Sequence, residues 1–178
     1  MHYFSEVKIL EGDKLTAVPF FIGMKKLGEK LSEIVNSEAS QFGLFLVNYT
    51  ISPNGLYRFY MDSEEILSMK ELTEFTRHIS VIIDEGDFGE KAFTFEISSP
   101  GADSPIKDFR QLGKHVGRSF KITNKEGAEY KGQLEKLDGE VLHILNEVKE
   151  KGKKKINIEP VEISWNQIEE IKIILSFK

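Results

Sequence analysis

The chain has 178 residues, of which 40% are hydrophobic and 30% are charged, an ordinary composition for a globular protein of one large or two small domains. It contains no cysteine, which excludes disulfides, thiolate catalysis and cysteine-ligated metal sites and suits a reducing cytosol. No apolar run is long enough to span a bilayer and the start has no signal-peptide pattern, so we expect a cytoplasmic protein.

The net charge of -5 is unevenly distributed along the chain. Residues 1–104 carry 9 basic and 17 acidic side chains, a balance of -8, whereas residues 105–178 carry 15 and 12, a balance of +3. The asymmetry indicates two modules with different partners, although a simple difference between solvated faces would also produce it. The balance of the second part is far below that of a typical nucleic-acid-binding domain.

The first part of the chain predicts an α/β domain. Residues 1–22 show no clear pattern, and we set them apart as an extension without an assigned function. Residues 23–37 repeat apolar side chains at three- and four-residue spacing, which predicts a helix. Residues 42–51 and 56–61 alternate as two antiparallel strands around a tight Asn54-Gly55 turn. One face of the first strand is predicted to hold Phe45, Val47, Tyr49 and Ile51.

A second helix and a third strand complete this domain. Ser68 and Glu71 have the spacing of a capping box, which predicts the start of a helix that ends near Asp84. Residues 92–98 alternate as a third strand. We therefore expect two helices on one face of a three-stranded sheet, over residues 23–100.

Short strands dominate the rest of the chain. Residues 109–112 predict a turn or a short helical piece, and about five short strands follow, the fourth of them broken at Pro160. Gly132 predicts a bulge or a tight bend in the second of these strands. So many short strands favour a small closed barrel of the Sm/SH3-like type. The predicted fold class is α+β, with a linker at residues 101–106 and the barrel at residues 107–178.

The sequence contains no recognisable catalytic or metal-binding motif. Nucleotide-binding glycine motifs, a G-x-S-x-G elbow and H-E-x-x-H are missing, and the four histidines fall in separate elements, so we expect no metal and no cofactor. The acidic stretch Asp62–Glu65 is interpreted as a solvated turn rather than a cation site.

The stretch EISSPGADSPI, residues 96–106, allows three interpretations. Ser98 or Ser99 could be a nucleophile on a sharp turn, the turn could bind an anion, or it could be a hinge between two folded units. A nucleophilic serine needs a nearby base, and none is evident in the sequence.

Basic residues gather at the start of the second part and in a lysine-rich loop. They are candidate contacts with RNA phosphates, and the alternative is that they are solubilising loop lysines and edge-strand lysines. These candidates are Arg110, Lys114, Arg118, Lys121, Lys153, Lys154 and Lys155.

The junction between the two parts resembles that of the ribosome maturation factor RimP family, and the resemblance extends over residues 24–178. In this family a strand ends in S-S-P-G and is followed by D-x-P. The corresponding residues are Ser98, Ser99, Pro100, Gly101, Asp103 and Pro105. Phe109 and Gly113 follow as in the family, whereas Ala102 and Ser104 replace its usual Leu and Arg, so a contact made by that arginine is not carried over.

The resemblance implies a non-enzymatic assembly factor with an N-terminal α/β domain and a C-terminal Sm/SH3-like barrel. It implies binding to the immature small ribosomal subunit, through ribosomal RNA and a decoding-centre ribosomal protein. We expect a monomer whose acidic first domain holds the basic protein while the barrel approaches RNA. An Sm-like RNA-binding regulatory protein is the alternative, which exposed stacking aromatics such as Phe120 and Tyr130 would favour. A hydrolase that uses the Ser-Ser-Pro-Gly turn is a third hypothesis.

Overall fold

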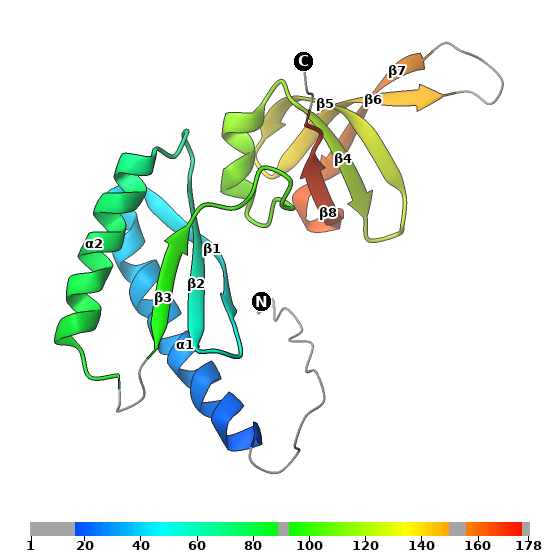
Figure 1. The fold of residues 1–178 in the computed structure, drawn as a ribbon. Helices are drawn as coiled ribbons and strands as arrows, with labels where there is room; N and C mark the ends of the chain where they lie inside the picture. The colour runs from blue at the N-terminus through cyan, green and yellow to red at the C-terminus, as the bar shows by residue number, and fades with distance from the viewer. Residues whose placement is uncertain (1–16, 89–92, 150–155, 176–178) are drawn as a thin grey trace.

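The computed structural model describes residues 17–88, 93–149 and 156–175, which form two domains joined by a short linker (Figure 1). In chain order, the elements are α1 (Ala17–Ala39), η1 (Ser40–Phe42), β1 (Leu44–Ile51), β2 (Leu56–Ser63), α2 (Met69–Glu85), β3 (Thr94–Ser98), η2 (Phe109–His115), β4 (Ser119–Asn124), β5 (Glu129–Asp138), β6 (Val141–Lys149), β7 (Ile156–Ser164), η3 (Trp165–Gln167) and β8 (Ile168–Ile173). No helix in these ranges is long and apolar enough to cross a membrane.

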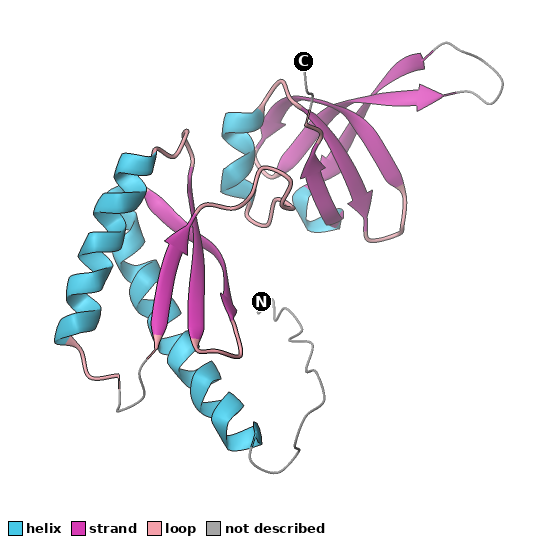
Figure 2. Ribbon diagram, in the orientation of Figure 1, coloured by secondary structure: helices cyan, strands magenta, loops and turns pink. Residues whose placement is uncertain are grey.

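The first domain places α1 and α2 on one face of a sheet with the strand order β1-β2-β3 (Figure 2). β1 and β2 form an antiparallel hairpin, and β3 returns parallel to β2 after α2. The core between helices and sheet includes Leu31, Phe59, Phe75 and Ile79, all fully buried. The predicted arrangement of two helices on one face of a three-stranded sheet is therefore confirmed.

Local sequence signals determine where these elements begin and end. The capping box at the start of α2 is confirmed, since the Ser68 hydroxyl accepts from the Glu71 amide at 3.2 Å and Glu71 accepts from the Ser68 amide at 2.8 Å. Gly55 has φ of 81° in the β1–β2 turn, a left-handed conformation that glycine adopts without strain. α1 begins at Ala17, so residues 17–22 of the predicted extension are helical.

The prediction that Phe45 shares a face with Tyr49 and Ile51 is wrong. The pairing of β1 with β2 shifts between Leu46 and Asn48, and such a bulge reverses the facing of every side chain beyond it. Tyr49 consequently stacks on Phe59 in the core, whereas Phe45 lies opposite Asp62 on the face away from the helices.

The second domain is a five-stranded antiparallel sheet in the order β7-β6-β5-β4-β8. Its core is made by apolar side chains from every strand and from η2. The fully buried members are Leu112, Phe120, Ile122, Leu134 and Leu142. Within the described ranges the strand pairings run from β7 to β8 without a pairing between these two end strands. Closure into an Sm/SH3-like barrel thus stays a prediction.

Two predictions about the strands of this domain need correction. Pro160 does not break its strand, because β7 lies at the edge of the sheet, where a missing amide hydrogen is tolerated. The bulge in β5 falls between Leu134 and Lys136 rather than at Gly132. A Cβ at Gly132 would lie 2.1 Å from the Leu145 carbonyl oxygen, so this glycine instead permits close approach of β6.

Candidate functional site

The linker after β3 is a compact turn. The Ser104 amide donates to the Gly101 carbonyl at 2.9 Å, and the Ser98 hydroxyl donates to the Ser99 carbonyl at 3.4 Å. A Cβ at Gly101 would lie 2.9 Å from an Asp103 carboxylate oxygen, a contact that the exposed Asp103 side chain can relieve by moving. These contacts agree with a junction between two folded units.

The same turn lacks the partners that catalysis by serine requires. In the described ranges, neither the Ser98 nor the Ser99 hydroxyl is hydrogen-bonded to a histidine or a carboxylate, so no general base activates it. The same part of the chain holds no group of three potential metal ligands. The geometry therefore gives the hydrolase hypothesis no support.

The end of the linker is fixed in the second domain. The Ile106 amide donates to the Ile171 carbonyl of β8 at 2.9 Å, and the Ile106 side chain is buried in the second core. η2 follows immediately with a capping box of its own. The Asp108 carboxylate accepts from the Arg110 amide at 3.0 Å, and the side-chain oxygen Oε1 of Gln111 accepts from the backbone amides of Lys107 and Asp108 at 3.0 and 3.1 Å.

A buried polar network connects η2 to the end of β2. Gln111 donates from Nε2 to Oδ2 of Asp62 at 2.8 Å, and the Lys114 ammonium contacts the other carboxylate oxygen and donates to the Ser63 carbonyl at 2.9 Å. Asp62 and Gln111 are 7% and 2% exposed. Because both carboxylate oxygens of Asp62 are satisfied by the second domain, the network positions one domain against the other. The interpretation of Asp62 as part of a solvated turn is wrong.

An aromatic contact lies beside this network. The Arg110 guanidinium lies 4.0 Å from the centre of the Phe45 ring, and it also pairs with Asp108 at 2.7 Å. Phe45 is 4% exposed, so η2 covers an aromatic ring that the bulge in β1 has turned away from the first core. Burial alone would raise the pKa of Asp108, but the hydrogen bonds from Arg110 outweigh it and lower this pKa.

His115 is the last residue of η2, and its imidazole lies in a partly buried position near two basic side chains. Burial, followed by the charges of Arg118 and Lys114, lowers its pKa below the ordinary value of 6.5. Its Nδ1 has no hydrogen-bond partner among the described residues. The neutral imidazole is therefore favoured next to the interdomain network.

Those predicted RNA contacts that the structure describes differ in exposure and in their partners, and they do not form one exposed cluster. Lys114 is 11% exposed at its side chain and makes interdomain contacts, and Arg110 is half-exposed over Phe45. Arg118 is exposed, and Lys121 is 55% exposed although it pairs with Glu129 at 2.7 Å. Lys153, Lys154 and Lys155 lie outside the described residues. The assignment of these side chains to ribosome contacts stays a prediction.

Sequence reasoning missed the residues that join the domains. Gln111 has no predicted role, Asp62 was interpreted as part of a solvated turn and Phe45 was placed on the wrong face, since their partners are distant in sequence and follow no periodic pattern. One signal was available: Asp108 and Gln111 have capping-box spacing, which predicts an ordered turn directly after the linker.

Comparison with known proteins identifies the first domain. Residues 31–103, which include the Ser-Ser-Pro-Gly turn, match the RimP N-terminal domain. This part of the chain is therefore similar to the RimP family. The chain is 29% identical over 146 residues to a protein of Cytophaga hutchinsonii named ribosome maturation factor RimP, a match that covers 76% of this chain and 87% of that relative. RimP similarity thus extends beyond the first domain.

Proposed function

We propose that the protein is a ribosome maturation factor that assists assembly of the small ribosomal subunit. The observation that carries this proposal is the match of residues 31–103 to the RimP N-terminal domain. It is supported by the similarity to the ribosome maturation factor RimP of Cytophaga hutchinsonii, which covers 87% of that protein. We further propose that it acts in the cytoplasm, without catalysis, by binding ribosomal RNA and a decoding-centre ribosomal protein of the immature subunit.

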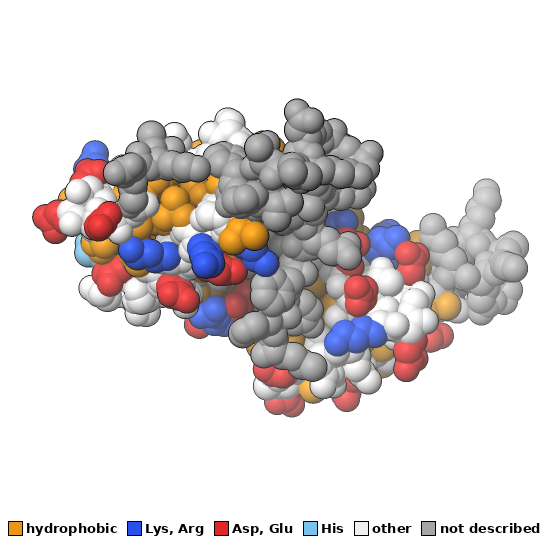
Figure 3. Space-filling view, turned by 90° about the horizontal axis from the view of Figure 1, so that it is seen from below, with side chains coloured by type: hydrophobic (Ala, Val, Ile, Leu, Met, Phe, Trp, Pro, Cys, Tyr) orange, Lys and Arg blue, Asp and Glu red, His pale blue; other side chains and the backbone are white. Residues whose placement is uncertain are grey.

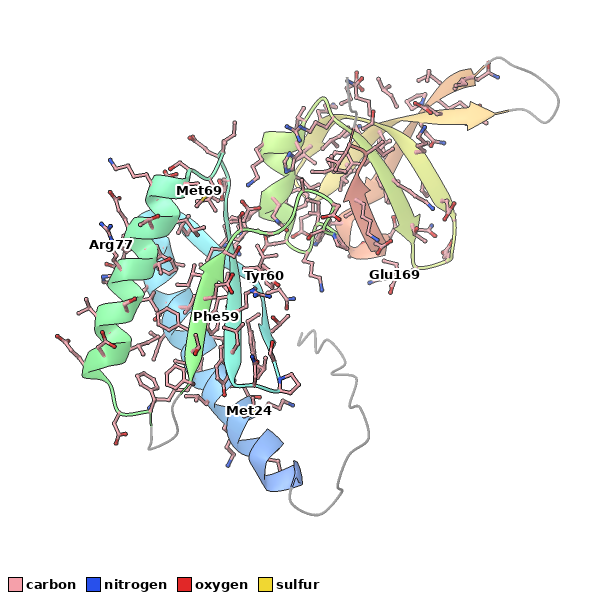
Figure 4. The ribbon with its side chains drawn as sticks, in the orientation of Figure 1. Met24, Phe59, Tyr60, Met69, Arg77 and Glu169 are labelled. Carbon is pink, nitrogen blue, oxygen red and sulfur yellow. The ribbon has the colours of Figure 1, made fainter. Side chains whose placement is uncertain are left out.

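The charge distribution supports a partner that binds and then leaves. Figure 3 shows acidic and basic side chains interleaved on the face seen from below, rather than one large basic surface. An acidic balance of -8 in residues 1–104 would attract a basic protein, and a balance of +3 in residues 105–178 would tolerate RNA. Moderate electrostatics of this kind favours reversible association.

The interdomain network supports the idea that both domains bind as one unit. Asp62, Gln111 and Lys114 hold the two domains in one relative position, and the compact linker shortens the path between them. Two surfaces held in a fixed arrangement engage a common partner with less loss of conformational entropy than two freely moving domains. An Sm/SH3-like barrel is our proposal for the second domain, supported by its five strands and the short η3 before β8.

The alternative of an Sm-like regulator receives no support from the aromatic side chains. Phe120 is fully buried, and Tyr130 packs partly against the second core. Neither provides the exposed stacking surface that sequence-tolerant RNA binding requires.

Co-sedimentation with small ribosomal subunits over a salt series tests the proposal. We expect the full chain to sediment with subunits at about 50 mM salt and to be released progressively towards about 200 mM, since contacts with phosphates release counterions. Immature subunits should bind more protein than mature ones. Failure to bind immature subunits even at the lowest salt would overturn the proposed function.

A further inference from the structure

The strands β6 and β7 extend beyond the sheet to which they belong. β5 pairs with β6 only as far as Gly132, which lies opposite Asn146. β6 and β7 remain paired for three further steps, up to Lys149 opposite Ile156. Figure 1 shows this two-stranded ribbon projecting away from the rest of the second domain. We call residues 145–149 and 156–160 the arm.

The apolar residues of β7 change faces at the base of the arm. Within the sheet, Leu142, Ile144 and Ile163 are buried in the core. The β6–β7 register contains no shift, so the face of each side chain simply alternates along the strands. By this alternation Ile156 and Ile158 point to the side opposite the core.

This second apolar face is exposed. Ile156 and Ile158 are 43% and 56% exposed, and Pro160 on the same face is exposed as well. Leu145, paired with Pro160, is half-buried and extends the face into the sheet. Glu147, which lies opposite Ile158, is a charged residue of this face, and it pairs with Lys131 of β5 at 3.1 Å. A two-stranded ribbon with an uncovered apolar face has little stability of its own in water. Folding of the second domain gives no reason for this face, which therefore fits a binding surface.

The arm is poorly suited to a partner β-strand. β7 lies at the edge of the sheet, and a strand could pair with this edge only where amide hydrogens are available. Pro160 removes one such hydrogen in the middle of β7, and proline in sheets is found where the missing hydrogen would face solvent. A second copy of the chain or an extended peptide is thus disfavoured.

The composition of the chain at the end of the arm favours RNA. The sequence from residue 149 to residue 155 contains five lysines, and these residues connect the two strands of the ribbon. Double-stranded RNA has a wide, shallow minor groove lined by ribose, with phosphates along its rims. Apolar side chains can contact ribose while lysines contact phosphate oxygens. The exposed isoleucines and the lysine content together fit such a groove.

We propose that the arm, through Leu145, Ile156, Ile158 and Pro160, docks in the minor groove of a double-stranded segment of ribosomal RNA. This inference rests on the proposed function and names the surface and the RNA form that carry it. The proposal gives the exposed apolar side chains of the arm a role in RNA binding, in addition to the phosphate contacts that lysines can make.

The test replaces both isoleucines in the full chain, Ile156→Ser with Ile158→Ser. The matched control is Val81→Ser, which removes a comparably exposed apolar side chain, 55% exposed, from α2 in the other domain. Binding is measured by fluorescence anisotropy to a 16-base-pair RNA duplex and to the DNA duplex of the same sequence, and by co-sedimentation with immature small subunits. Circular dichroism establishes that each variant is folded.

We expect the double variant to bind the RNA duplex about tenfold more weakly than the wild type, with a parallel loss on subunits, and the control to bind normally. The DNA duplex, with its narrower minor groove, should bind more weakly than RNA. Unchanged binding of the double variant to subunits would overturn the arm proposal and leave the proposed function intact. Loss of subunit binding without any loss of RNA binding would show a protein partner and also overturn it.

A shortened arm provides a second variant if the serine substitutions disturb folding. Asn146 and Glu159 face each other across β6 and β7, so residues 147–158 can be replaced by a two-residue Asn-Gly turn. This change keeps every pairing of β5 with β6. RNA binding should fall at least as far as in the double variant, and wild-type affinity would overturn the proposal. A wild-type protein that binds no subunits would instead count against the proposed function.

Discussion

The interdomain contact and the arm differ in which kind of side chain is buried and which is exposed. At the interdomain contact, a carboxylate, an amide and an ammonium group are buried, and each finds partners within the chain. On the arm, isoleucines are exposed, and nothing in the described ranges covers them. Buried polar groups with complete hydrogen bonding indicate an internal function, namely to position the domains. Exposed apolar groups on an ordered ribbon indicate an external partner. The following predictions test this difference.

The largest effect is expected from Asp62→Ala. The substitution leaves the Lys114 ammonium and the Gln111 amide without their shared acceptor in a buried position, which should cost about 3 kcal/mol of interdomain stability. Urea denaturation should then show two separate transitions, and small-angle X-ray scattering should show a larger radius of gyration. Asp84→Ala, an exposed carboxylate on α2, is the control and should resemble the wild type. A single, unshifted transition for Asp62→Ala would contradict the proposed role of the network.

A smaller effect is expected from Arg110→Ala. The change removes the cation–π contact with Phe45 and the pair with Asp108, and it should destabilise the interdomain contact by about 1 kcal/mol. Arg110→Lys keeps the charge but loses the planar guanidinium, so it should lie between Arg110→Ala and the wild type. Equal denaturation midpoints for all three proteins would show that the stacked arginine contributes nothing.

A still smaller effect is expected from pH, through His115. Its pKa is lowered in the folded protein, mainly by burial, so the unfolded chain binds the proton more readily. Stability should therefore decrease as pH falls through the unfolded value of 6.5 towards the lower folded value. Denaturation midpoints measured from pH 7.5 to about pH 5 should fall less in His115→Gln than in the wild type. The same slope for both proteins would refute the assignment to His115.

The smallest effect on stability is expected from Ile158→Thr on the arm. This side chain is 56% exposed, and threonine keeps the β-branched shape that strands favour, so stability should change by less than about 0.5 kcal/mol. Ile144 on β6 is buried in the second core, so Ile144→Thr should instead clearly lower the stability of the protein. A marked loss of stability in Ile158→Thr would mean that the arm face is covered within the chain.

The local elements could be predicted from sequence because their signals lie within a few residues. Asn54-Gly55, with its positive φ, and the Ser68–Glu71 capping box determine a turn and a helix start by themselves. The change from helical to strand periodicity likewise predicted the α+β class. The bulge or bend predicted at Gly132 was wrong, because the glycine there permits the close approach of the Leu145 carbonyl instead.

The interdomain contact could not be predicted in the same way. Asp62 and Gln111 are 49 positions apart in sequence, so no local pattern connects them. Asp62 stands in an acidic stretch with Glu64 and Glu65, and such a stretch suggests a solvated turn. Lys114 was assigned to RNA because a lysine in a basic segment has the same local appearance whether its partner is a phosphate or a buried carboxylate. The exposed apolar face of the arm depends on register, which sequence could not fix across the lysine-rich loop.

The bulge in β1 gives one strand two structural functions. Before the bulge, Phe45 faces the second domain, and after it Tyr49 faces the helices, so a single extra residue divides the strand between two hydrophobic environments. Deleting that residue, Val47, would force a choice: either the aromatic contact with Arg110 or the packing of Tyr49 must be given up. The inserted residue thereby makes the internal order of the first domain compatible with its attachment to the second.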